Sequence, residues 1–172
     1  MAKDTAPSFE PGDMLGRSPW LRVEQTDIDV FGAATKDLEP LHNDPAWCAE
    51  NSPFGRPIAY GFQTLSLLTY LFYEATDGAF GGGRHTTNFP INYGFERVRL
   101  ITPVTVGSEI RGAFRLLQSD ERQPGELLLT IEATVEIRGL ERPALVAEWL
   151  FIWVTGDGRQ SVARSIRMAA AE

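Results

Sequence analysis

Apolar positions with helical spacing are densest between residues 62 and 76. The spaced side chains are Phe62, Leu65, Leu68, Leu71, Phe72 and Ala75. Recurrence every three or four residues predicts a helix. Because Leu67, Tyr70 and Tyr73 add apolar bulk on the remaining sides, we expect this helix to be buried, and Gly78 supplies its stop signal.

The spacing of apolar positions changes after residue 88. Four segments are alternating or continuously apolar: 91–101, 110–116, 127–138 and 144–154. Alternation predicts half-buried strands, and the almost wholly apolar last segment predicts a strand covered on both faces. One buried helix followed by four strands predicts an α+β fold with an antiparallel sheet and the helix on one face. An open edge of that sheet is a place where a second subunit can pair.

The segment before the helix predicts short elements only. Thr26 predicts the N-cap of a short helix, and Asp44 followed by Pro45 predicts the start of another. Because Pro40 would break a helix, we expect residues 36–43 to form a loop.

Length and composition indicate a single domain over residues 1–172. Residues 1–18 are expected to be an irregular lead-in and residues 155–172 a C-terminal tail. A net charge of −7 argues against a nucleic-acid or anionic-membrane surface. The lone Cys48 cannot form an internal disulfide, and the first residues carry no apolar signal core, so we expect a cytoplasmic protein.

Candidate chemistry is concentrated in the stretch KDLEPLHNDP, where Asp37 and His42 lie on one expected loop. A loop can bring a carboxylate and an imidazole to one point, although both side chains could also serve an ordinary turn. A zinc site from these two residues with Asp44 and Cys48 lacks the usual ligand spacing. The glycines at 81–83 lack the residues of a phosphate-binding loop, and His85 beside them is expected to be solvated.

Three segments resemble one known family. They are DLEPLH at 37–42, FGRPIAYGFQTLSLL at 54–68 and INYGFERVRLITPVTVGSEIR at 91–111. In this order they resemble the hydratase motif and flanking segments of the MaoC-like dehydratases, which include the (R)-specific enoyl-CoA hydratases, and most closely the single-domain NodN-like branch. The resemblance covers roughly residues 20–154.

This resemblance implies a hot-dog fold, a long helix wrapped by an antiparallel sheet, in a homodimer. It also implies reversible syn addition of water to a trans-2-enoyl thioester. Asp37 and His42 would be the catalytic acid/base pair, and the backbone N–H of Gly61 would face the thioester oxygen. No metal or other cofactor is implied beyond the CoA, or a carrier protein, of the substrate.

The remaining candidate residues concern substrate binding. The family's Asn is Glu39 here, and a residue that is often His is Tyr60, which changes the polarity expected around the pair. Phe62 is a candidate for lining an acyl tunnel. The candidates for binding the CoA phosphates are Arg56, Arg84, Arg97 and Arg99.

Two alternatives stay open on the sequence. A hot-dog acyl-CoA thioesterase commonly has an acid in the early turns of its central helix, where this chain reads FQTLSLLTYL, and Glu74 comes too late. A non-catalytic module that binds acyl thioesters would keep the fold without needing both Asp37 and His42.

Overall fold

The computed structural model describes residues 9–80 and 88–156. The expectations for the glycines at 81–83, for Arg84 and His85, and for nearly all of the C-terminal tail lie outside these residues. The described strands are β1 (Met14–Arg17), β2 (Leu21–Arg22), β3 (Phe89–Leu100), β4 (Glu109–Gln123), β5 (Glu126–Ile137) and β6 (Leu145–Val154). They form one six-stranded sheet in the order β1-β4-β5-β6-β3, with β2 also on β4. Every named pairing is antiparallel.

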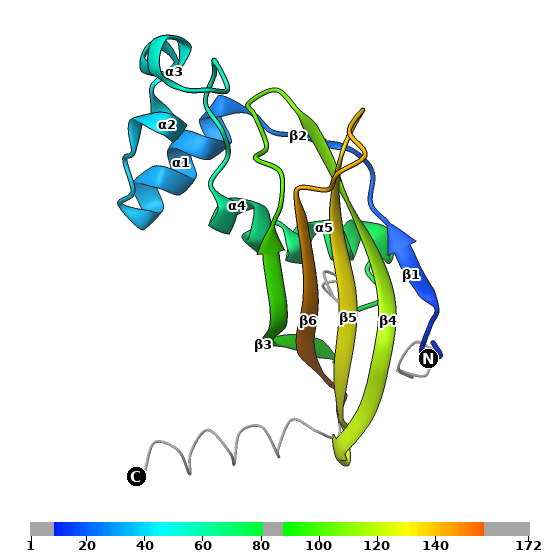
Figure 1. Ribbon diagram of the computed structural model, residues 1–172. Helices are drawn as coiled ribbons and strands as arrows, with labels where there is room; N and C mark the ends of the chain where they lie inside the picture. The colour runs from blue at the N-terminus through cyan, green and yellow to red at the C-terminus, as the bar shows by residue number, and fades with distance from the viewer. Residues whose placement is uncertain (1–8, 81–87, 157–172) are drawn as a thin grey trace, which may run out of the picture.

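The predicted buried helix is present as two segments. They are α4 (Gly61–Ser66) and α5 (Leu68–Ala75); in Figure 1 α5 passes behind the sheet and α4 lies to its left, near the end of β3. The break is at Leu67, whose ψ of −15° is shallower than the roughly −42° of a regular α-helix and tightens the turn. Helix α5 packs against β4 and β1, which confirms the prediction of a helical segment on one face of the sheet. The segment is not the single continuous helix that was predicted, because it is interrupted at Leu67.

The core is centred on Phe72 of α5. Its ring lies 5.1 to 5.6 Å, centroid to centroid, from four other rings, those of Phe80, Phe114, Trp149 and Phe151. Three of these pairs are edge-to-face, a geometry that adds to the gain from burial. The side chain is 1% exposed, so the helix is fixed to the sheet at its C-terminal half.

Two strands were missed in the sequence. The expected irregular lead-in contains β1, and β2 follows it; both pair with β4. A four-residue strand that includes Gly16 carries no readable alternation. That glycine is required, because a Cβ there would overlap the backbone carbonyl of Ala75 at the end of α5.

Three short helices form an overhang beside the sheet, at the upper left of Figure 1. They are α1 (Gln25–Thr35), α2 (Pro40–Asn43) and α3 (Pro45–Asn51). The predicted start of α3 is confirmed, since the Asp44 side chain accepts the Trp47 N–H. The N-cap of α1 is Glu24 rather than Thr26. The expected loop at 36–43 is also partly wrong, because Pro40 begins the single turn of α2, and proline is compatible with a first helical position.

Candidate active site

The end of α1 positions Asp37. Lys36 ends the helix in the left-handed conformation, with φ of 63°, and the Asp37 N–H then donates to the Gly32 carbonyl. This reversal turns the chain toward α2. The Asp37 carboxylate is exposed and accepts the Glu39 N–H at 3.3 Å, so only one long local contact orients it.

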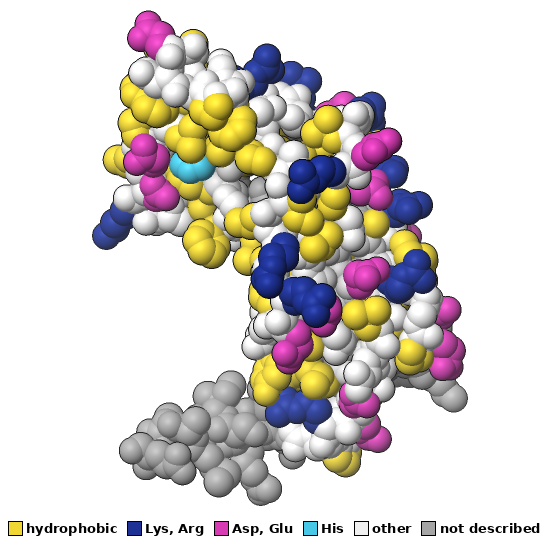
Figure 2. Space-filling model, in the orientation of Figure 1, with side chains coloured by type: hydrophobic (Ala, Val, Ile, Leu, Met, Phe, Trp, Pro, Cys, Tyr) yellow, Lys and Arg dark blue, Asp and Glu magenta, His cyan; other side chains and the backbone are white. Residues whose placement is uncertain are grey.

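The single turn of α2 positions His42. Its Nδ1 lies 2.7 Å from the carbonyl oxygen of Ile58. Because a carbonyl only accepts, Nδ1 carries the proton of the neutral ring and Nε2 is left as the basic nitrogen. The Gln25 side chain donates to the His42 carbonyl, which ties this turn to α1. In Figure 2 the histidine of the overhang lies among acidic and hydrophobic side chains.

Tyr60 connects the two candidate catalytic residues. Its ring centroid lies 3.8 Å from that of His42, and its hydroxyl donates to the Asp37 carbonyl at 2.5 Å. Asp37 and His42 are therefore held against one buried side chain that comes from the segment just before α4.

A cavity of about 240 Å³ adjoins His42. Its lining residues are His42, Ile58, Ala59, Gly61, Thr64, Leu100, Ile101, Thr102, Pro103, Val104 and Ala144. Most of them are apolar, as is common in small-molecule pockets. The wall is held together by the Ala59 N–H, which donates to the Val104 carbonyl at 2.7 Å.

Gly61 brings the start of α4 to this cavity. The helix has no side-chain cap at its N-cap residue, Tyr60, so its first-turn N–H groups are not occupied by a cap. A Cβ on Gly61 would overlap Cδ1 of Leu100. The cavity thus combines a histidine with a helix start that carries no side chain at its first residue.

Asp37 is not among the residues of the cavity wall, and the other predicted binding residues lie outside it as well. Glu39 is exposed and is the N-cap residue of α2. Phe62 is 75% exposed, although it follows Gly61 directly. Arg56 is exposed in the connection between α3 and α4. Tyr60 is 4% exposed and contacts the Asp37 carbonyl and the His42 ring.

The strand arginines lie on β3. Arg97 is within 3.7 Å of the Glu148 carboxylate on β6, and Arg99 donates to the Val98 carbonyl at 2.8 Å. Both have local partners, whereas Arg56 makes no ion pair within the described part of the chain.

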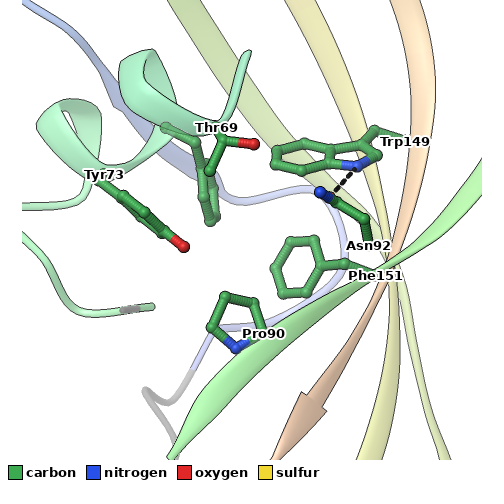
Figure 3. Close-up of a pocket in the computed structure, with 7 residues that line it drawn as sticks. Thr69, Tyr73, Pro90, Asn92, Trp149 and Phe151 are labelled. Carbon is green, nitrogen blue, oxygen red and sulfur yellow. Dashed lines mark hydrogen bonds between the residues drawn. The ribbon is translucent and has the colours of Figure 1, made fainter. Parts of the chain in front are cut away.

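A second, smaller cavity was not anticipated from the sequence. It measures about 40 Å³ and is lined by Thr69, Phe72, Tyr73, Pro90, Asn92, Trp149 and Phe151 (Figure 3). The Trp149 indole N–H donates to the Asn92 side chain at 3.1 Å, as the dashed line in Figure 3 shows. Pairing of Pro90 and Asn92 on β3 with residues of β6 creates this cavity, and no local sequence signal encodes it.

Cys48 takes part in packing. It is fully buried, and its thiol lies within 3.4 Å of the carbonyl oxygens of Pro40 and Leu41, which share its one proton, so the contact supports α2. Burial, with the nearby Asp44 carboxylate, raises the pKa of the Cys48 thiol. Within residues 9–80 and 88–156, no three His, Cys, Asp or Glu side chains are grouped as metal ligands would be. None of the helices in those ranges combines the length and apolar character needed to cross a membrane.

Comparisons with known proteins agree on one family. The MaoC like domain model matches residues 7–136. Nodulation protein N of Rhizobium leguminosarum bv. viciae is 43% identical over 141 residues, which are 82% of this chain and 84% of that protein. The 3-hydroxyacyl-thioester dehydratase Z of Mycobacterium tuberculosis is 35% identical over 145 residues, with coverage of 83% and 90%.

The comparison with solved structures confirms the predicted hot-dog fold. The (R)-hydratase from A. caviae involved in PHA biosynthesis superposes with a TM-score of 0.67 at 27% identity. The superposition covers 85% of this chain and 98% of that one.

Proposed function

The chain belongs to the MaoC-like dehydratase family, and on this premise we propose that it is an (R)-specific 2-enoyl-CoA hydratase that also catalyses the reverse dehydration. One relative is named a 3-hydroxyacyl-thioester dehydratase and one structural neighbour an (R)-hydratase. The name of the nodulation protein specifies no reaction. The observation that carries the proposal is the cavity that has both His42 and the uncapped start of α4 in its wall.

In this proposal Asp37 and His42 hold one water molecule between them. The water oxygen forms a bond to the β-carbon of the enoyl thioester as the pair removes a proton. The same pair returns a proton to the α-carbon, so the reaction is neutral overall. Each such proton transfer contributes about 10²–10⁴-fold to the rate. The neutral tautomer of His42, with Nε2 free to accept, suits this role.

Gly61 stabilises the thioester oxygen in this proposal. Negative charge collects on that oxygen when the water adds, and an N–H at a helix start can donate to it. The absence of a side chain at Gly61 allows the thioester to approach the backbone. Proton transfer and charge stabilisation are thus assigned to groups of the chain itself, and no cofactor is required besides the substrate's CoA or carrier protein.

The proposed assembly is a homodimer paired along β3. This strand is an edge strand of the sheet, and within the described residues no strand pairs with its outer side. Tyr93 is 56% exposed there, together with Phe89 and Phe95, which are 37% and 38% exposed. An open, aromatic strand edge is a template for pairing with another copy. Light scattering on the purified protein tests this, and a monomer at micromolar concentration would contradict it.

Hydration of crotonyl-CoA tests the proposed activity. Loss of the enoyl absorbance without release of free thiol, with an (R)-3-hydroxy product, supports the hydratase. Thiol release identifies a thioesterase instead, and no turnover favours a binding module. Asp37→Asn and His42→Gln should each lower kcat by about 10²-fold or more. Asp120→Asn, on β4 and hydrogen-bonded to Gln118, is the matched control and should leave kcat unchanged.

A further inference from the structure

The Tyr60 hydroxyl lies in a closed polar network. It donates to the Asp37 carbonyl at 2.5 Å and accepts from the Asn43 side-chain amide at 2.6 Å. The same amide lies 3.3 Å from the Glu39 carbonyl. This hydroxyl therefore joins the connection between α1 and α2 to the residue that follows His42.

The Tyr60 ring fixes the imidazole at the same time. Its centroid is 3.8 Å from that of His42, at 31°, and 5.3 Å from that of Phe31, at 40°. The imidazole is thus held by the tyrosine ring and by the bond from Nδ1 to the Ile58 carbonyl. One buried side chain contacts both members of the proposed catalytic pair.

Gly32 of α1 leaves the space that this arrangement needs. A Cβ at that position would overlap the Tyr60 hydroxyl. It would also lie 2.8 Å from the Asp37 carbonyl oxygen and 3.1 Å from the Asn43 side-chain oxygen. A glycine inside a helix costs about 1 kcal/mol relative to alanine, and the network accounts for its presence here.

We propose that Tyr60 is a positioning residue that sets the separation of Asp37 and His42. Gly32 leaves space for the Tyr60 hydroxyl, and the Asn43 amide donates a hydrogen bond to it. The inference rests on the proposed hydratase function. Its physical reason is that the Asp37 carboxylate is exposed and has only the 3.3 Å contact with the Glu39 N–H to orient it. The carbonyl of Asp37, held by Tyr60, is then what fixes the backbone of this residue relative to the tyrosine ring that contacts His42.

Tyr60→Phe tests the inference because it keeps the ring and removes only the hydroxyl. We expect kcat for crotonyl-CoA to fall by on the order of tenfold to a hundredfold, with KM within about threefold of the wild-type value, since the reacting groups shift while the cavity stays intact. Tyr70→Phe makes the same chemical change at a half-exposed tyrosine and should leave both constants unchanged. A kcat within twofold of wild type in Tyr60→Phe would overturn the proposal.

A double-mutant cycle separates positioning from general destabilisation. Gly32→Ala alone should lower kcat through its overlap with the hydroxyl. In the Tyr60→Phe background the overlap with the hydroxyl is gone and the close approach to the Asp37 carbonyl remains, so the two losses should combine to less than their sum in free energy. Additive losses in proteins that remain folded by circular dichroism would refute the network. An inactive wild type would instead refute the hydratase function itself.

Discussion

Gly61→Ala should separate the stability of this protein from its activity. The new Cβ would lie closer to Cδ1 of Leu100 than the 3.0 Å limit that real Cβ atoms keep. That neighbour is the end of a flexible side chain which is 55% exposed, so it can rotate away at a cost of about 1 kcal/mol or less. Alanine is also a better helix former than glycine by up to about 1 kcal/mol. We therefore expect the free energy of unfolding to change by less than about 1 kcal/mol.

The effect of Gly61→Ala on activity should be far larger. The added methyl group stands beside the N–H proposed to face the thioester oxygen, in a cavity of about 240 Å³. Loss of one oxyanion donor typically costs about 10²–10³-fold in kcat, or roughly 3–4 kcal/mol. We expect kcat/KM for crotonyl-CoA to fall by about 10²-fold. Urea unfolding followed by circular dichroism and initial rates of enoyl consumption measure the two quantities on the same preparation.

Two further variants make this prediction refutable. Ser66→Ala alters an exposed hydroxyl on the same helix and should change neither quantity appreciably. Adding Leu100→Ala to Gly61→Ala removes the displaced leucine. If the double variant regains wild-type activity, the loss came from the moved leucine and not from the blocked N–H. If Gly61→Ala alone keeps kcat/KM within twofold, the role proposed for Gly61 is wrong.

Three other outcomes are expected. Arg56→Ala should raise KM for crotonyl-CoA severalfold, and it should not change KM for a crotonyl thioester that lacks the CoA phosphates. Arg115→Ala, on β4 beside Glu132, is the control and should change neither KM value. Because burial and the nearby Asp44 carboxylate raise the pKa of the Cys48 thiol, the unfolded thiol ionises first as pH rises. The free energy of unfolding should therefore begin to fall above about pH 8.5, and a Cys48→Ala protein should lack this component in urea titrations at successive pH values. Phe72→Ala should cost about 3–5 kcal/mol of unfolding free energy by urea titration, and a cost under about 1 kcal/mol would contradict its central place in the core.

The fold was predictable where periodicity extends over many residues. Strands β5 and β6 and the helical segment at 61–75 begin and end within one or two residues of the expected bounds. Strand β4 runs to Gln123, well beyond the expected end at Leu116, because the polar residues after Leu116 hide the alternation; the other elements that were missed or misplaced are short. A two-residue strand such as β2 has no period, and α2 begins at a proline whose position relative to a helix start cannot be read locally.

The site was predictable in part, and for a physical reason. The motif that contains Asp37 and His42 is contiguous, so its resemblance to one family was visible in the chain. Tyr60 was identified only as a departure from that family. Its contacts with both residues depend on how the segment before α4 packs against the overhang, and the need for Gly32 appears only once that packing is known.

The strand at the open edge of the sheet also reaches the cavity. Leu100, the last residue of β3, is part of the wall, and Ile101 to Val104 continue it. A second copy that pairs along this strand would hold this side of the cavity wall in place. Turnover per protein molecule should then depend on concentration, declining on dilution as the copies separate, even though both proposed acid/base groups belong to the same chain.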